Sequence, residues 1–240
     1  MLKNAVLITG GSQRVGLHLA RQFLQNTHYP LVVTYRTERE SIAELQRAGA
    51  ICLQVDFMQP ESLVGLLLQL KAQVASFRAV IHNASIWVND ASVAKQPELF
   101  DQLLQLHLQV PWHLNHHLAD LLAKTDEKQA DIISLTDTSI ASGAPEFSAY
   151  LSTKAALQNL TLSLAQKWAP KIKVNDIAPG LLMFHPQDSE AYKQARLQRQ
   201  LLPQEPGPEV IWQAVAYIMQ SSYSTGVSLP VDGGVNLGSK

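Results

Sequence analysis

Short apolar runs alternate along the chain with longer segments in which apolar residues recur three and four positions apart. The short runs are rich in Val, Ile and Leu and are bounded by polar or turn-forming residues, which is typical of strands buried in a parallel sheet. The longer segments have the spacing of amphipathic helices. We expect seven strands, at residues 5–9, 31–35, 51–55, 79–82, 132–136, 173–177 and 226–231, and helices at 15–25, 41–48, 61–72, 97–124, 150–168 and 208–220.

This alternation predicts an α/β fold. Each parallel strand needs a crossover to the next, and helices that supply it cover both faces of the sheet. The expected architecture is a Rossmann-type, doubly wound, seven-stranded parallel sheet with helices on both faces. No internal repeat, low-complexity tract or Gly/Ser-rich linker divides the sequence, so we expect residues 1–240 to form a single dinucleotide-binding domain.

Two segments depart from the alternation. Pro111 lies inside the longest helical stretch, which should therefore kink or restart near Val110. Residues 180–208 carry several prolines among polar residues, where a crossover of a few residues would be enough. We expect this segment to be a lid over a ligand cleft; a surface excursion without function is the alternative.

Composition narrows the classes of function. Of the 240 residues, 46% are hydrophobic, enough for one large core and too many for a disordered chain. The 19 Lys and Arg against 20 Asp and Glu give a net charge of −1, so no basic field is available for nucleic acid. No run reaches the roughly 18 apolar residues of a membrane span, and the N-terminal apolar run is too short for a secretion signal. The single cysteine, Cys52, suits a reducing compartment, and we expect a cytoplasmic protein with neither membrane nor nucleic-acid partners.

A glycine-rich turn, Thr-Gly-Gly-Ser-Gln-Arg-Val-Gly at residues 9–16, lies directly after the first predicted strand and before the first helix. Glycine at positions 10 and 16 lets the backbone approach a pyrophosphate, and the N-terminus of the helix offers unpaired N–H groups with a partial positive charge. A dinucleotide-binding fold needs such a turn at this place. We therefore expect the cofactor to contact Gly10, Ser12, Gln13, Arg14, Val15 and Gly16.

The end of the second strand indicates which cofactor binds. An NAD site usually has Asp or Glu there to accept the ribose 2′-hydroxyl, whereas this strand ends in Tyr-Arg-Thr at 35–37. Arg36 can pair with a 2′-phosphate, and Arg14 can reach it from the glycine turn, so NADPH is favoured over NADH. Alternatively, Arg36 belongs to a solvated charge run with residues 38–40. After the third strand, Asp56 could meet the adenine amino group or cap the next helix. The cofactor contacts expected at this end are Tyr35, Arg36, Thr37, Asp56 and Phe57.

Tyr150 and Lys154 are four residues apart at the start of a predicted helix, which places both side chains on one face about one turn apart. A lysine in this position can hold a ribose hydroxyl, and its charge can lower the pKa of the phenol toward neutrality. Tyr150 would then be a usable proton donor. We expect this pair to be catalytic.

Five motifs together resemble the short-chain dehydrogenase/reductase family over essentially the whole chain. They are Thr9-Gly10-x-x-x-Arg14-x-Gly16, His82-Asn83-Ala84-Ser85, Tyr150-x-x-x-Lys154, Asn175-x-Ile177-x-Pro179-Gly180 and Val231-Asp232-Gly233-Gly234. The resemblance implies that the pair Asn83-Ala84 lies beside the cofactor and that Lys154 binds the nicotinamide ribose. It also implies that the segment after Pro179, with Leu182 where many members have Thr, contacts the carboxamide. Dimers and tetramers are usual in this family, and the predicted helix at 150–168, apolar nearly all round, suits a homodimer or homotetramer.

Two departures from the family pattern concern the reacting groups. The family usually has a serine thirteen residues before the tyrosine, which donates a hydrogen bond to a substrate carbonyl; here that position is Asp137. An ionised carboxylate cannot donate and opposes negative charge on a carbonyl oxygen, so it suits a substrate that presents N–H donors. His107 replaces a usual asparagine that anchors a relay water to Lys154, and it would have to stay neutral beside that lysine.

Asp137, Tyr150 and Arg14 together resemble the pteridine reductase branch of the family, and Trp87 lies where that branch has an aromatic ring that stacks on the pterin. Within the branch, the sequence is similar to the bacterial dihydromonapterin reductases. The resemblance implies NADPH-dependent reduction of dihydromonapterin to tetrahydromonapterin, with weaker activity on dihydrofolate. Hydride would go to C6 of the pterin and a proton to N5, supplied either by Tyr150 or by a water near Arg14. Asp137, the third residue expected to be catalytic, would hold the amino edge of the pterin or pass a proton through Tyr150. The substrate contacts expected are Ser85, Trp87, Asp137, Tyr150 and Gly180.

Two other functions remain open on the sequence. Thr138 and Ser139 lie next to Asp137, so a shift of one residue could restore a hydroxyl donor and make the protein a carbonyl or 3-oxoacyl thioester reductase. Loss of the usual serine and asparagine could instead indicate a non-catalytic NADP-binding regulator. His113 and His117 have metal-ligand spacing, but no third ligand accompanies them, so no metal site is expected.

Overall fold

The computed structural model describes residues 1–237, and its seven strands form one sheet in the order β3-β2-β1-β4-β5-β6-β7. Every neighbouring pair of strands is parallel. The strands are β1 (Ala5–Ile8), β2 (Leu31–Tyr35), β3 (Ile51–Gln54), β4 (Phe77–His82), β5 (Ala130–Leu135), β6 (Ile172–Pro179) and β7 (Ser228–Val231). The predicted doubly wound, seven-stranded parallel sheet is confirmed.

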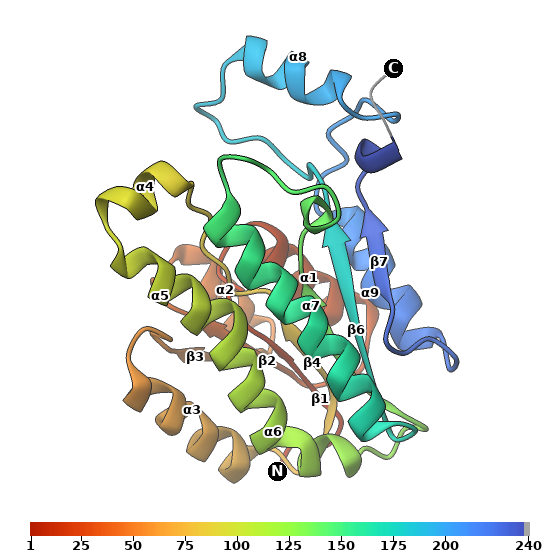
Figure 1. The fold of residues 1–240 in the computed structure, drawn as a ribbon. Coiled ribbons are helices and arrows are strands. Elements are labelled where there is room, and N and C mark those ends of the chain that lie inside the picture. The colour runs from red at the N-terminus through yellow and green to blue at the C-terminus, as the bar shows by residue number, and fades with distance from the viewer. Residues whose placement is uncertain (238–240) are drawn as a thin grey trace.

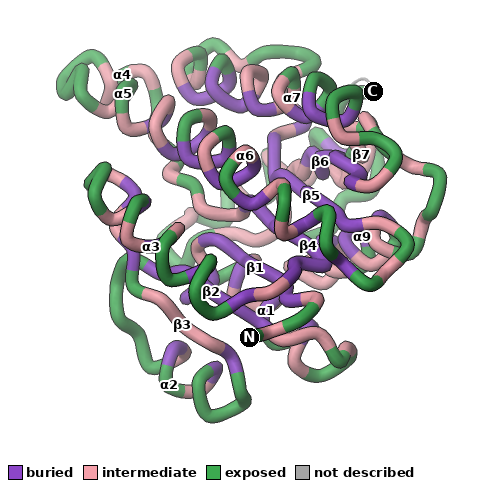
Figure 2. Tube along the Cα trace, turned by 90° about the horizontal axis from the view of Figure 1, so that it is seen from below, coloured by how far each residue is buried: buried purple, intermediate pink, exposed green. Residues whose placement is uncertain are grey.

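Helices cover both faces of this sheet (Figures 1 and 2). The main ones are α1 (Arg14–Asn26), α2 (Glu40–Arg47), α3 (Pro60–Gln73), α6 (Val110–Ala123), α7 (Ser148–Trp168) and α9 (Glu209–Gln220). On one face, α3, α6 and α7 bury side chains such as Leu66, Leu114 and Leu164 against the strands. On the other, α1 and α9 bury Phe23 and Ile211. Within residues 1–237, no helix combines the length and the hydropathy needed to cross a membrane.

The long helical stretch predicted at 97–124 consists of three parts. The helix α5 (Glu98–Leu104) passes into a π-helical turn (Gln105–Gln109), and α6 begins at Val110 with Pro111 in its first turn. Proline has no N–H and its ring crowds the preceding turn, so a wider turn ahead of it avoids a lost hydrogen bond and a clash. The expected restart near Val110 is confirmed, and His107 lies buried in the wide turn.

The sequence pattern does not predict the two short helices α4 (Asp90–Lys95) and α8 (Glu190–Gln198). Each begins after a capping side chain, Asn89 or Ser189, which accepts a backbone N–H three residues further on. Neither helix has a buried residue, so neither has the apolar periodicity that reveals a helix in a sequence. Figure 1 shows α8, which belongs to the segment 180–208, above the carboxyl ends of the strands.

The strand order changes direction between β1 and β4. From β1 the chain continues to β2 on one side, whereas β4 lies on the other, so the loops after β1 and β4 diverge. Such a switch point opens a crevice at the carboxyl ends of the strands, where doubly wound sheets bind their ligands. The Thr9 hydroxyl joins the two loops, because its oxygen accepts the backbone N–H groups of Asn83 and Ala84 at 3.1 Å each.

Candidate active site

A cavity of about 800 Å³ opens at the carboxyl ends of β1 to β4. Its wall contains most of the residues expected to bind a cofactor and two of those expected to bind a substrate. They are Gly10, Ser12, Gln13, Arg14, Val15, Gly16, Tyr35, Arg36, Thr37, Asp56, Phe57, Asn83 and Ala84 for the cofactor, and Ser85 and Trp87 for the substrate. The remaining expected residues, Asp137, Tyr150, Lys154, Pro179, Gly180 and Leu182, do not line this cavity.

The glycine turn is shaped so that only glycine fits at its two key positions. Gly10 has a φ of +71°, and a Cβ there would lie 2.9 Å from the Cα of Ala84. A Cβ on Gly16 would lie 2.2 Å from the carbonyl oxygen of Gly10. The side-chain amide of Asn83 holds the turn by donating to the carbonyls of Thr9 (3.0 Å) and Gly10 (2.8 Å). The backbone and the N-terminus of α1 thereby border the cavity with no intervening side chain, which fits a pyrophosphate.

Cations border the part of the cavity beside β2. Arg14, Arg36 and Arg39 all lie on its wall and are exposed. Arg36 and Arg39 line the same cavity as the glycine turn. This position favours a role in cofactor binding over a solvated charge run. Three guanidinium groups at this place fit a phosphate better than an unmodified ribose hydroxyl.

Asp56 follows β3 and lies on the cavity wall. Its Oδ1 accepts the backbone N–H of Met58 at 3.0 Å. The N-cap of α3 is Gln59, so the alternative in which Asp56 caps that helix is wrong. Its second carboxylate oxygen has no protein donor among the contacts of residues 1–237, in keeping with a place beside the adenine.

Tyr150 and Lys154 lie in the first turns of α7 and are 7% and 3% exposed. The Lys154 Nζ donates to the carbonyl of Leu135, at the end of β5, at 2.8 Å. It lies 5.7 Å from the centre of the Tyr150 ring. Burial lowers the pKa of the Lys154 ammonium to about 8, although the carboxylate of Asp137 acts in the opposite direction.

The Tyr150 phenol does not behave as the sequence predicts. Burial raises its pKa above the usual value, the negative charge of Asp137 raises it further, and only the Ser85 hydroxyl lowers it. The expectation that Lys154 brings this pKa toward neutrality is therefore wrong. Tyr150 holds its proton at neutral pH, so it can donate one but is a poor base.

Asp137 follows β5 and forms the N-cap of a short turn, where its Oδ1 accepts the N–H of Ser139 at 2.7 Å. Its neighbour Thr138 is buried, and the Thr138 hydroxyl donates to Asp232 and accepts from Asn236, both at 2.6 Å. The hydrogen of the Thr138 hydroxyl is thus used by Asp232 and is not available to a substrate. Of the two hydroxyls that could replace the missing serine, only that of Ser139 is left.

His107 is 1% exposed and lies between two hydroxyl groups. Its Nε2 is 2.8 Å from the Ser85 Oγ, and its Nδ1 is 2.9 Å from the Thr153 Oγ1. Burial, with a smaller effect from the charge on Lys154, lowers the pKa of the imidazole to about 2. The expectation that His107 stays neutral is confirmed, and both of its nitrogens are occupied by side chains of the protein.

Trp87 lies on the cavity wall together with Ser85 and Ile86. Its ring stacks on Phe147, with centroids 4.6 Å apart and planes 27° from parallel. Phe147 directly precedes α7, so Trp87 is fixed beside the helix that carries Tyr150. The side chain is still 60% exposed, which leaves apolar ring surface for a flat ligand.

The segment after β6 contains the expected ligand contacts Gly180 and Leu182. The Gly180 N–H donates to the carbonyl of Val231 at 3.0 Å, and the Leu182 carbonyl accepts the N–H of Gly207 at 2.8 Å. These residues brace the segment against its neighbours, and Leu182 packs against the core. Later in the same segment, three residues line the cavity: His185, Gln187 and Asp188.

Sequence reasoning missed several wall residues. They are Thr34, Arg39, Val55, Met58, Ile86, Leu106, His185, Gln187 and Asp188. Most of them flank expected contacts at strand ends, so extending each motif by one or two positions would have found them. No local pattern distinguishes those in the segment 180–208.

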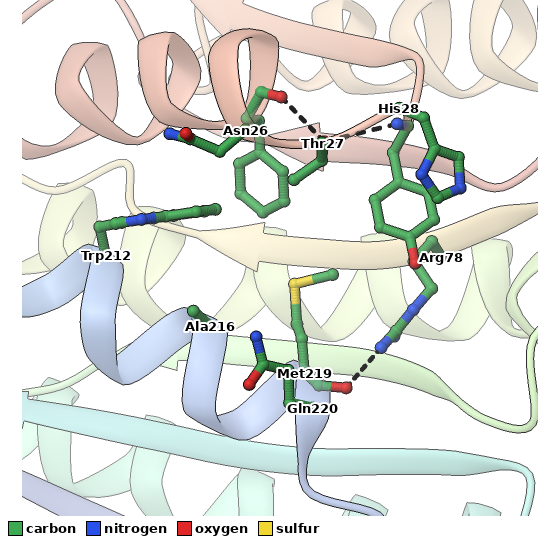
Figure 3. A pocket seen from close by; sticks show the side chains of 10 residues that line it. Asn26, Thr27, His28, Arg78, Trp212, Ala216, Met219 and Gln220 are labelled. Carbon is green, nitrogen blue, oxygen red and sulfur yellow. Dashed lines mark hydrogen bonds between the residues drawn. The ribbon is translucent and has the colours of Figure 1, made fainter.

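A second cavity, of about 240 Å³, lies at the opposite end of the sheet (Figure 3). Trp212 and Met219 of α9 line it together with Thr27, which follows α1, and Arg78 of β4. Arg78 donates to the carbonyl of Met219 at 2.7 Å and forms a buried ion pair with Asp131. Ligands of doubly wound sheets bind at the carboxyl ends of the strands, so this cavity is not the candidate active site.

Comparison with known proteins gives consistent results. The family model described as short chain dehydrogenase matches residues 4–193. A dihydromonapterin reductase of Klebsiella pneumoniae is 41% identical over 229 residues, which is 95% of both chains. One of Escherichia coli is 38% identical over 232 residues, covering 97% of this chain and 96% of its own. The crystal structure of FolM alternative dihydrofolate reductase 1 from Brucella suis in complex with NADP aligns with a TM-score of 0.87 at 25% identity, covering 100% of this chain and 98% of that one. This chain therefore belongs to the short-chain dehydrogenase/reductase family.

Proposed function

We propose that this protein is an NADPH-dependent reductase of 7,8-dihydropterins, which converts dihydromonapterin to tetrahydromonapterin and acts more weakly on dihydrofolate. The observation that carries the proposal is the Asp137 carboxylate, whose charge acts on both Tyr150 and Lys154 at the place where the family usually has a serine donor. The names of the dihydromonapterin reductase relatives support the substrate. The NADP complex of the Brucella protein supports the cofactor.

The cavity wall fits the cofactor. The glycine turn and the N-terminus of α1 would hold the pyrophosphate, and Arg36 with Arg14 would hold the 2′-phosphate. The Lys154 ammonium, positive below a pKa of about 8, would hold the nicotinamide ribose. When bound, the cofactor supplies the hydride that reduces the substrate.

The protein's own side chains would orient the pterin and move the proton. The exposed surface of Trp87 offers a stacking platform for a flat ring, which would fix the orientation of the pterin. The Asp137 carboxylate accepts N–H groups and so favours the amino edge of a pterin over a ketone oxygen. The Tyr150 phenol keeps its proton at neutral pH and can donate it, directly or through water, to the ring nitrogen that becomes basic on reduction.

The test is oxidation of NADPH by the purified protein with 7,8-dihydromonapterin, dihydrofolate and an acetoacetyl thioester offered in parallel. We expect dihydromonapterin to turn over fastest and dihydrofolate more slowly. Tyr150→Phe should lower kcat by about 100-fold or more, because it removes the proton donor. Tyr217→Phe, which changes an exposed tyrosine of α9, is the matched control and should have no effect.

Asp137→Ser tests whether the protein is a dihydropterin reductase, a carbonyl reductase or a non-catalytic regulator. If the carboxylate recognises N–H groups, the substitution lowers dihydropterin turnover. Reduction of the thioester alone by the unmodified protein would contradict the proposal and would point to the Ser139 hydroxyl as a carbonyl donor. NADPH binding without turnover of any substrate would favour a regulator.

We also propose that the chain acts as a single cytoplasmic reductase domain in which residues 180–208 close over the cavity. The Arg14 guanidinium donates to the carbonyl of Met183 at 3.2 Å and so connects the glycine turn with this segment. His185 and Asp188 already border the cavity. Removal of α8 is expected to raise the KM for dihydropterin more than the Kd for NADPH, measured by stopped-flow and by fluorescence titration.

The outer face of α6 and α7 is proposed as the contact between copies of this chain. Trp112 and Leu162 are each 43% exposed there. The Trp112 ring stacks on His116, whose ring meets that of Trp168, so the exposed surface is aromatic and contiguous. Leu162→Glu should reduce the mass measured by light scattering to that of a monomer, whereas Val64→Glu, on the exposed side of α3, should not.

A further inference from the structure

The imidazole of His107 lies between the hydroxyl groups of Ser85 and Thr153, and the geometry determines which way each hydrogen points. The Thr153 Oγ1 donates to the backbone carbonyl of Tyr150 at 2.8 Å. A hydroxyl has only one hydrogen. Toward the imidazole the Thr153 oxygen is therefore an acceptor, and the His107 Nδ1, 2.9 Å away, must carry the hydrogen of that contact.

A neutral imidazole carries a hydrogen on only one nitrogen. His107 is buried, with its pKa far below neutrality, so the second nitrogen cannot also be protonated. The Nε2 is thus a bare acceptor, and the hydrogen in its 2.8 Å contact with Ser85 belongs to the serine hydroxyl. The Ser85 Oγ also lies 3.3 Å from the carbonyl oxygen of Ile86, but the contact with His107 is the shorter one and the stronger hydrogen bond. The chain of bonds runs in one direction, from Ser85 through His107 and Thr153 to the Tyr150 carbonyl.

We propose that His107 is a positioning residue that holds the Ser85 hydrogen inward, so that Ser85 presents its oxygen lone pairs, and not its proton, to the cavity. The effect on substrate binding rests on the proposed function, whereas the direction of the hydrogen bonds does not. Ser85 is exposed on the cavity wall, so its free lone pairs face whatever binds there.

The consequence concerns substrate class. With the Ser85 hydrogen withdrawn, the Ser85 oxygen is an acceptor, and the Asp137 carboxylate, whose charge acts on Tyr150, is an acceptor too. Both would then accept hydrogen bonds from a substrate bound beside Tyr150. A heterocycle whose edge presents N–H or NH₂ groups can pair with two such acceptors, whereas a carbonyl oxygen would meet lone pairs at both. With its hydrogen donated to His107, the Ser85 hydroxyl no longer lowers the pKa of the Tyr150 phenol, whereas burial and the Asp137 charge still raise it. The phenol therefore keeps its proton and is the donor that this set of side chains offers to the substrate.

The direct test is the tautomer of His107, read from the ¹⁵N chemical shifts of the protein labelled in its histidines. The His107→Asn variant identifies the signal. We expect the hydrogen on Nδ1, with no change of the signal across the neutral pH range. A hydrogen on Nε2, or a charged ring at neutral pH, would overturn the proposal. This measurement needs neither substrate nor cofactor, so it fails or succeeds independently of the proposed function.

Thr153→Val tests the link to substrate binding, because it removes the acceptor for the Nδ1 hydrogen and keeps the shape of the side chain. We expect the His107 hydrogen to move to Nε2 and the Ser85 hydrogen to turn toward the cavity. The KM for dihydropterin should then rise about fivefold to tenfold, the worth of one hydrogen bond, with the Kd for NADPH unchanged. Thr161→Val is the matched control, since Thr161 is equally buried in α7 and donates to the Leu157 carbonyl.

Ser85→Ala provides a variant on the exposed wall that leaves the core intact. It should raise the KM for dihydropterin to a similar extent while His107 keeps its hydrogen on Nδ1. An unchanged KM in Ser85→Ala, or in a Thr153→Val protein whose tautomer has moved, would show that the direction of these bonds does not act on the substrate and would overturn the proposal.

Discussion

Burial, more than any neighbouring charge, sets the protonation of the side chains around Tyr150. It raises the pKa of the Tyr150 phenol, lowers that of Lys154 to about 8 and lowers that of His107 to about 2. The sequence places Tyr150 and Lys154 one helical turn apart, but it does not say how deeply the pair is buried. That is why their spacing could be predicted, whereas the direction of the phenol's shift could not.

The pH dependence of cofactor capture follows from Lys154. A lysine is charged below its pKa, so the charge that holds the ribose is present below a pH of about 8 and is lost as the pH rises through that value. The kcat/KM for NADPH, which reports on the free enzyme, should fall over the same range. Lys154→Arg stays charged and should move this fall to higher pH, whereas Lys167→Arg, an exposed change on the same helix, should leave it in place. A fall that persists unchanged in Lys154→Arg would assign it to another group.

Arg36 accounts for the expected preference for NADPH at the level of a single side chain. Arg36→Ala should weaken NADPH binding by roughly tenfold to a hundredfold, the range for a lost charge-assisted hydrogen bond, and should change NADH binding little. Fluorescence titration with both cofactors measures the two constants. Arg47→Ala removes an exposed arginine of the neighbouring helix and should affect neither. Equal losses for the two cofactors would contradict a role in 2′-phosphate recognition.

At the scale of elements, the strands and the packed helices could be predicted because each buries an apolar face. The helix α8 could not, since none of its residues is buried. The π-helical turn before α6 was foreseen only as a disturbance near Pro111. That turn places His107 between Ser85 and Thr153. These contacts join residues 22 and 46 positions apart in the sequence, so no local sequence pattern predicts them.

The glycine turn is the element whose function depends most directly on backbone shape. In Gly16→Ala the new Cβ would lie 2.2 Å from the Gly10 carbonyl and 2.5 Å from the Asn83 amide, so the turn must move. We expect NADPH binding to weaken more than tenfold, with a lower melting temperature, because the amides that cradle the pyrophosphate are displaced. Gly65→Ala, in the interior of α3 with nothing within 4 Å, is the control. It should bind NADPH normally and be more stable by about 1 kcal/mol.

On the scale of the whole molecule, the two ends of the sheet have separate tasks. The carboxyl ends form the cavity, whereas the amino ends hold a buried cluster of Arg78 on β4, Asp131 on β5 and Lys173 on β6. The Lys173 Nζ lies 3.0 Å from the Asp131 carboxylate, which is fully buried. A sequence shows these as three isolated charges in apolar strands, so their pairing could not be predicted before the strand order was known.

This separation predicts a variant that loses stability and keeps its binding properties. Asp131→Asn keeps the shape of the side chain but leaves two buried cations without their anion, and should lower the free energy of unfolding by about 3–5 kcal/mol. Denaturant titration measures the loss, with Asp120→Asn, an exposed change on α6, as the control expected within about 0.5 kcal/mol of the unmodified protein. Because the cluster lies at the end of the sheet away from the glycine turn, the folded variant should bind NADPH with an unchanged Kd. A large change in that constant, with stability preserved, would mean that the amino ends of the strands are coupled to the cofactor site and that the two ends are not independent.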